Sequence, residues 1–116
     1  MSITGVRSYD LGVMSGVGLA VTDAVALADG LVLVSAAAED AATTYDDGPV
    51  AGSALALLDG DRLADLAELP LLDGAVSKVE GLALAGQVGD RLDLVAVVDA
   101  DDPAVPSLLL ELEITQ

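Results

Sequence analysis

Short apolar runs, each closed by a turn signal, are the feature that most limits what this chain can fold into. The runs are rich in Val and Leu, and two of them, Ala20 to Ala28 and Leu31 to Ala38, are separated only by Asp29-Gly30. An Asp-Gly pair between apolar runs favours a type I′ hairpin, because both central residues of that turn need a positive φ. Runs and turns at regular spacing are typical of an all-β fold.

The pattern inside the runs also indicates strands. Arg91 to Val95 and Leu110 to Ile114 alternate polar and apolar residues, which is the period of a strand with one buried face. The run Arg62 to Leu69 has apolar residues at helical spacing as well. Because it follows the turn signal Asp59-Gly60, we expect a strand there too.

Three runs of the first half recur in the same order in the second half. Asp23 to Leu27 matches Glu80 to Leu84, Leu31 to Ser35 matches Leu92 to Ala96, and Ser53 to Leu55 matches Ser107 to Leu109. An acidic, Pro-containing loop precedes the last run of each copy. The repeat predicts a first four-stranded antiparallel unit at residues 19–70 and a second unit at 75–116, which a strand at residues 6–13 would complete.

Repeated four-stranded antiparallel units are typical of β-propeller blades. Two blades cannot close a ring, since known rings use about four to eight. We therefore expect residues 1–116 to form one propeller segment, with the ring completed by association of several chains. Three copies would give six blades and four copies eight, and we favour the homotrimer. The alternative is a piece of a longer propeller or an engineered one.

One stretch resembles a known family. Lys78 to Leu84 reads KVEGLAL and resembles the K-[IV]-E-G-[IL]-A strand of bacterial propellers of the SdiA-regulated and esterase-like phytase type. The loop Asp99 to Pro103 and the strand Ser107 to Leu109 look like the rest of that blade. The resemblance implies a propeller fold and, as an alternative function, a metal-dependent phytase-like or esterase-like hydrolase.

Charge and composition exclude several classes of function. The chain has 20 acidic and 4 basic side chains, a net charge of -16, and neither Cys nor His. The charge argues against nucleic acid and anionic membranes as partners. The missing residues remove disulfides, thiol nucleophiles and the commonest general base. The charge would also suit an acidic scaffold for cationic protein partners, which is a further alternative.

We expect neither a membrane-spanning segment nor an export signal in this sequence. No uncharged run approaches the roughly 20 residues of a spanning helix. No apolar segment of the kind found in secretory signals follows Arg7. We therefore expect a cytoplasmic protein.

The candidate site residues follow from the propeller hypothesis, in which the first strand of each blade lines the central channel. Asp23 and Glu80 lie on these matched strands, and Lys78, two residues before Glu80, faces the same side. Carboxylates from several copies around one axis would bind a cation, Ca²⁺ or Mg²⁺. The alternative is that Lys78 pairs with Glu80 or Asp23 and that the channel holds only water.

The second acidic loop is the other candidate for a metal. Asp99, Asp101 and Asp102 could offer oxygen ligands to Ca²⁺, although the spacing is not that of an EF-hand. The alternative is a solvated turn, where Asp suits the local backbone geometry. The sequence assigns no catalytic residue and no required cofactor, and it favours a self-assembling structural or binding module of unknown ligand.

Overall fold

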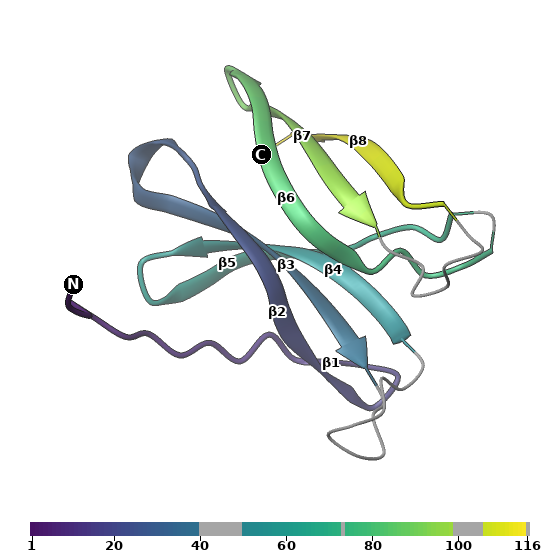
Figure 1. Ribbon diagram of the computed structural model, residues 1–116. Coiled ribbons are helices and arrows are strands. Elements are labelled where there is room, and N and C mark those ends of the chain that lie inside the picture. Colours follow the sequence, from purple (N-terminus) through teal and green to yellow (C-terminus); the bar gives the residue numbers. More distant parts are fainter. Residues whose placement is uncertain (40–49, 73, 99–105, 116) are drawn as a thin grey trace.

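The computed structural model describes residues 1–39, 50–72, 74–98 and 106–115 and is all-β, as the sequence predicted (Figure 1). Its strands are β1 (Val13–Met14), β2 (Val17–Ala26), β3 (Leu31–Glu39), β4 (Val50–Asp59), β5 (Arg62–Glu68), β6 (Val79–Val88), β7 (Arg91–Val98) and β8 (Leu108–Thr115). A 3-10 turn, η1 (Ala28–Gly30), joins β2 to β3. In the described part of the chain, no helix is both long and apolar enough to cross a membrane.

The strands form two antiparallel sheets, each in the order of the sequence. The first sheet has the order β1-β2-β3-β4-β5 and the second β6-β7-β8. The four strands β2 to β5 fall largely within the range predicted for the first unit, and β6 to β8 fall within that of the second. The first sheet curls, and the second lies across one of its faces (Figure 1). Whether these sheets act as propeller blades stays a prediction.

Turn chemistry explains two of the hairpins in the first sheet, β2–β3 and β4–β5. Asp29 and Gly30 have φ values of 63° and 76°, so the hairpin expected at this pair is confirmed. Gly adopts such values without steric cost, and Asp tolerates them better than most residues. Gly60, with φ 62°, turns the chain between β4 and β5. Arg62 to Glu68 is therefore a strand rather than a helix, as predicted.

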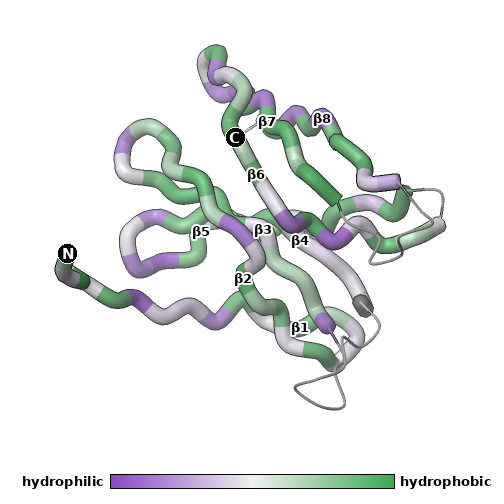
Figure 2. Tube along the Cα trace, viewed as in Figure 1, coloured by the Kyte–Doolittle hydropathy of each residue, from purple (hydrophilic) through white to green (hydrophobic). Residues whose placement is uncertain are grey.

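The main hydrophobic core lies between the two sheets. Leu33 and Leu55 contribute from the first sheet, and Leu92, Leu94 and Ala96 from the second, all at most 5% exposed. The complete buried cluster is Leu27, Leu33, Leu55, Val79, Leu82, Leu92, Leu94 and Ala96. Figure 2 shows that hydrophobic residues dominate the strands, while hydrophilic residues gather at hairpin turns. Burial of these apolar side chains is what holds one sheet on the other.

A second cluster covers the other face of the first sheet. Val34 and Leu58 pack there against Leu11, which precedes β1. Tyr9 packs beside them, and its hydroxyl donates a hydrogen bond to the carbonyl of Gly60. The strand β3 is consequently buried on both faces, with every residue from 33 to 38 buried. That is why its sequence is a continuous apolar run without alternation.

The N-terminal segment differs from the strand expected at residues 6–13. Only Val13 and Met14 form a strand, and they pair with β2 in the first sheet. Positive φ values at Gly12, Ser15 and Gly16 turn the chain so that β1 returns directly into β2. Residues 1–12 contribute no strand within this chain. Pairing of this segment with another copy stays a prediction.

Candidate functional site

The two sheets meet where β2 passes β6 (Figure 1). A carboxylate oxygen of Asp23 on β2 accepts a hydrogen bond from the backbone N–H of Leu82 on β6, at 2.6 Å. In the part of the chain that the structure describes, β6 is an edge of its sheet, so the backbone groups on its outer side have no neighbouring strand. Asp23 supplies the acceptor that one of these groups needs.

Each of these two strands carries a β-bulge close to the meeting point. The register shifts between Val21 and Asp23 in β2 and between Val79 and Gly81 in β6. A bulge adds one residue to a strand and redirects its side chain. The bulged residues are Thr22 and Glu80, and both line the same groove.

This groove lies between β2, the end of β3 and the start of β6, and has a volume of about 400 Å³. Its small lining residues are Gly18, Ala20 and Ala37, and its polar ones are Thr22, Glu39, Lys78 and Glu80. The small side chains leave room, and the polar side chains provide one cation and two carboxylates. The groove can therefore bind a small polar group by hydrogen bonds and charge.

Lys78 is the electrostatic centre of the groove. Its ammonium group forms an ion pair with Glu39 and a second, at 3.4 Å, with Glu80, while its side chain is only 16% exposed. The hydrogen bond with Glu39 raises the pKa of Lys78, burial opposes that rise, and the charge of Glu80 adds to it. Lys78 is therefore held as a cation between two acids.

The structure places the predicted site residues in different settings. Lys78 and Glu80 lie together as an ion pair, which is one of the two pairings expected in the absence of a cation. Asp23 instead bonds the backbone of Leu82. The loop acids Asp99, Asp101 and Asp102 lie outside the described residues. Among the residues that are described, no three metal-ligating side chains gather in one chain, so a cation ring would need several copies.

Sequence reasoning did not assign Glu39 to the site. The sequence groups Glu39 with Asp40 in an acidic loop, whereas β3 ends at Glu39 and holds its side chain against Lys78. One feature of the sequence could have indicated this role: Glu39 comes directly after the apolar run that ends at Ala38. A carboxylate so close to a core needs a partner, because burying an unpaired charge is costly.

The hydroxyl groups near the groove are engaged in structural hydrogen bonds. Thr22 and Ser35 bond each other at 2.7 Å, and Ser53 donates to the carbonyl of Ser77 at 2.6 Å. Ser77 neighbours Lys78 in the sequence, but a lysine held in its charged form is not a general base. Within the described part of the chain, this arrangement suits binding better than nucleophilic catalysis.

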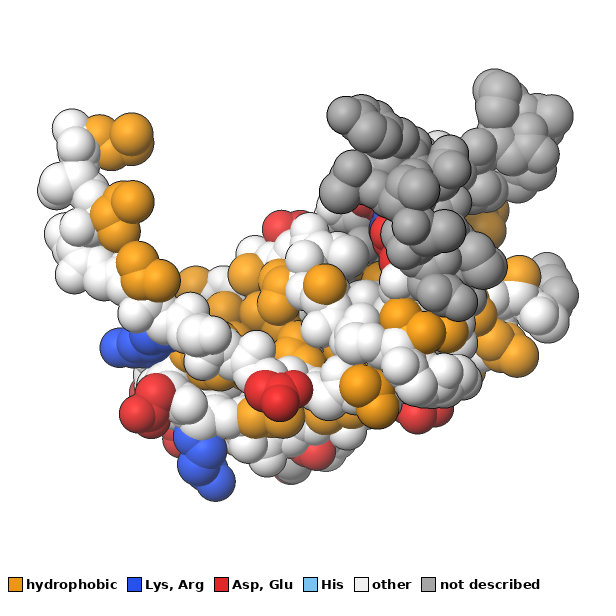
Figure 3. Space-filling view, turned by 90° about the horizontal axis from the view of Figure 1, so that it is seen from below, with side chains coloured by type: hydrophobic (Ala, Val, Ile, Leu, Met, Phe, Trp, Pro, Cys, Tyr) orange, Lys and Arg blue, Asp and Glu red, His pale blue; other side chains and the backbone are white. Residues whose placement is uncertain are grey.

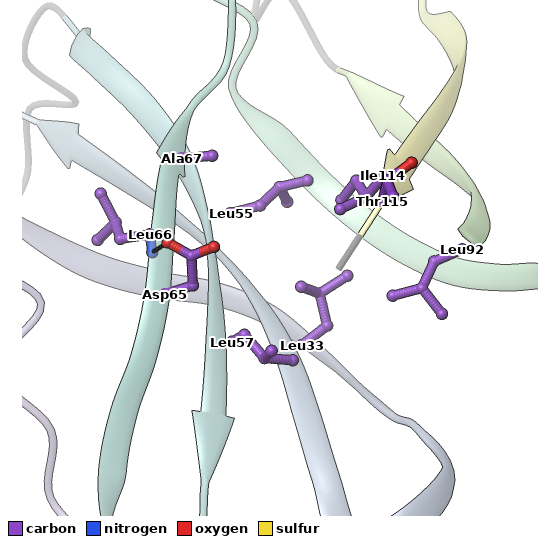
Figure 4. A pocket seen from close by; sticks show the side chains of 9 residues that line it. All are labelled: Leu33, Leu55, Leu57, Asp65, Leu66, Ala67, Leu92, Ile114 and Thr115. Carbon is purple, nitrogen blue, oxygen red and sulfur yellow. Dashed lines mark hydrogen bonds between the residues drawn. The ribbon is translucent and has the colours of Figure 1, made fainter. Parts of the chain in front are cut away.

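A second cavity lies between the sheets and is lined mostly by apolar side chains, with Asp65 and Thr115 as its polar lining residues (Figure 4). Leu33, Leu55 and Leu57 line it from the first sheet, and Leu92 and Ile114 from the second. Its volume is about 60 Å³, whereas a cavity that binds benzene measures about 150 Å³. It is therefore a packing gap in the core, and the groove beside Lys78 is the better candidate site.

Comparison with known proteins places the chain in a family. The model of DUF6910, a family of unknown function, matches residues 1–103, well over half of the sequence. The chain belongs to DUF6910. Searches of curated proteins and of solved structures each found no match. The DUF6910 match spans β1 to β7 and so includes the whole groove, while β8 follows it.

Proposed function

We propose that this chain is a structural and binding module that assembles, in several copies, into a ring of the β-propeller type. The observation that carries the proposal is the position of β2 beside β6, tied by the bond from Leu82 to Asp23. In a propeller, sheets are arranged around a central channel, and their first strands lie next to one another. The resemblance of Lys78 to Leu84 to a propeller strand supports the same arrangement.

The strand order supports association with further copies. The second sheet has three strands, whereas a propeller blade has four. Among the described residues, its last strand, β8, pairs with β7 and with no further strand, which leaves one edge open. The unpaired backbone groups of an open edge readily pair with another strand, so the second sheet can bind a strand of a neighbouring copy.

The outer face of the second sheet supports association as well. Val97 and Leu109 are paired across β7 and β8 and are 45% and 64% exposed. Both point away from the core that Leu94 and Ala96 form. Adjacent exposed apolar side chains indicate an interaction surface. In the proposed ring, this face packs on the first sheet of the next copy.

The groove gives the ring its binding role. It lies at the meeting of β2 and β6, and these strands face the channel in the proposed ring. Glu80 is 41% exposed although it pairs with Lys78. Three copies would bring three such carboxylates toward one axis, which is the arrangement that binds Ca²⁺ or Mg²⁺.

The experiment that tests the ring is a measurement of mass in solution by light scattering. We expect a mass near three times the 11.5 kDa of one chain. We also expect association to strengthen as salt is added, because salt screens the repulsion between copies that each carry a charge of -16. A mass of one chain at every salt concentration would contradict the proposal.

A further inference from the structure

We infer that residues 1–8 form an arm that adds as a strand to the β8 edge of a second copy of this chain. The inference rests on the proposed assembly and names the element that joins the copies. All eight residues of the arm are exposed, with Ile3 83% and Val6 85% accessible. Figure 3 shows hydrophobic side chains of this extended segment standing clear of the rest of the molecule.

The base of the arm is fixed, and this determines which copy it can reach. Tyr9 and Leu11 pack in the cluster that includes Val34 and Leu58. That cluster lies on the face of the first sheet opposite to the core shared with the second sheet. The arm therefore starts on the far side of the first sheet from its own β8, and a neighbouring copy must supply the edge.

The arm has the composition of a strand without a partner. Ile3, Thr4 and Val6 are β-branched, and such residues favour extended backbone when their side chains can pack against a sheet. The acceptor has a similar length, since β8 runs over eight residues. Pairing would satisfy backbone groups on both segments at once.

Charge complementarity points to β8 in particular. Arg7 is exposed on the arm, and the other three basic residues of the chain already form ion pairs, Arg62 with Asp59, Lys78 with Glu39 and Arg91 with Asp93. No acid of the described residues is ion-paired with Arg7. On β8, Glu111 and Glu113 alternate with the core-facing residues and are exposed. Opposite charges on adjacent strands stabilise their pairing.

The first test removes or reverses these charges in the full chain and measures self-association by light scattering. Deletion of residues 2–8 should abolish association, and Arg7→Glu should weaken it roughly tenfold. Arg62→Glu makes the same charge change outside the arm and should leave association unchanged. Combining Arg7→Glu with Glu111→Arg and Glu113→Arg should restore it.

The second test is a disulfide cross-link. The chain has no native cysteine, so a disulfide can form only between the introduced cysteines. One preparation carries Arg7→Cys, and the other carries Glu111→Cys or Glu113→Cys. On mixing under oxidising conditions, we expect a disulfide between the arm and at least one β8 position, because paired strands bring Cα atoms within disulfide range. Val88→Cys is the control and should not cross-link to the arm.

The possible results separate this inference from the proposed function. If the wild-type chain is monomeric, both fail. If it associates but the deletion variant associates equally well and no cross-link forms, the arm inference alone is wrong. Loss of association with the deletion together with the cross-link would establish the arm as the connecting strand.

Discussion

The carboxylate of Asp23 accepts a hydrogen bond from the backbone N–H of Leu82, 59 residues later in the chain, with 2.6 Å between the two atoms. One residue is on the first sheet and the other on the second. A bond from a backbone N–H to an ionised carboxylate is shorter and stronger than a neutral one. This contact therefore fixes the position of β6 relative to β2, and with it the shape of the groove.

Removal of the Asp23 carboxylate should destabilise the fold. In Asp23→Ala the N–H of Leu82 loses its acceptor at a partly buried site, which costs about 1–3 kcal/mol. Asp23→Asn keeps an acceptor oxygen but loses the charge, so we expect a smaller loss. Urea denaturation followed by circular dichroism measures both. Asp65→Ala is the control, because the bond that Asp65 accepts from the N–H of Leu66 is exposed. Equal losses in both alanine variants would contradict the role of Asp23.

Lys78→Met should destabilise the chain by about 1–2 kcal/mol, because it leaves Glu39 half-buried without its cation. Arg62→Met is the matched control. Its ion pair with Asp59 is exposed on both sides, and such pairs contribute about 0–1 kcal/mol. A loss in Lys78→Met no larger than that in the control would contradict the assignment.

The stability contributed by Lys78 should also depend on alkaline pH. Its pKa is raised above the ordinary value of 10.5, so the folded chain holds this proton more tightly than the unfolded chain does. The stabilisation is fully present below pH 10.5 and is lost as the pH rises through the higher pKa that Lys78 has in the folded chain. Denaturation of wild type and Lys78→Met between pH 8 and pH 12 measures this. The difference in unfolding free energy between wild type and Lys78→Met should shrink only at the alkaline end of this range. A difference that stays constant with pH would contradict the raised pKa of Lys78.

Substitutions at two leucines of the second sheet should affect different properties, one the stability of the fold and the other self-association. Leu94 is 1% exposed in the core, so Leu94→Ala should lower the unfolding free energy by about 2–5 kcal/mol. Leu109 is 64% exposed, so Leu109→Glu should leave the fold intact but weaken self-association. Val88→Glu adds the same charge at another exposed site and is the control for association. Thermal melting and light scattering separate the two effects, and strong unfolding of Leu109→Glu would place that residue in the core instead.

The turn between β2 and β3 should tolerate few replacements of Gly30. Its φ of 76° is a conformation that costs a β-branched residue roughly 1–2 kcal/mol. We therefore expect Gly30→Val to lower the melting temperature more than Gly30→Asn, because Asn visits this region more readily. Equal melting temperatures for the two variants would show that the turn does not hold this geometry.

Most of the strands could be predicted because their signals are local. Asp29-Gly30 specifies a hairpin through the φ values of two adjacent residues. The alternation in Arg91 to Val95 specifies a strand with one buried face, and that stretch lies in β7. The helical spacing within Arg62 to Leu69 was overridden by the turn before it, since a tight turn sends the chain back along β4.

The candidate site was predicted only in part. The pairing of Lys78 with Glu80 joins residues only two apart in the sequence, one just before β6 and one at its start, and a local pattern can indicate it. The stronger contact of Lys78, with Glu39, joins segments far apart in the sequence. Nothing in the local sequence of either residue specifies the other as its partner.

Most of the strands, the hairpin turns and the strong negative charge can be predicted from the sequence, because backbone preference and hydrophobic period act over a few residues. Three features arise from the three-dimensional packing instead. Asp23 bonds Leu82, Glu39 pairs with Lys78, and residues 1–8 extend away from the point where Tyr9 and Leu11 pack on the first sheet. These contacts form because the two sheets bury their apolar faces against each other. This packing involves the whole chain, and it brings together segments whose local sequences do not specify one another as partners.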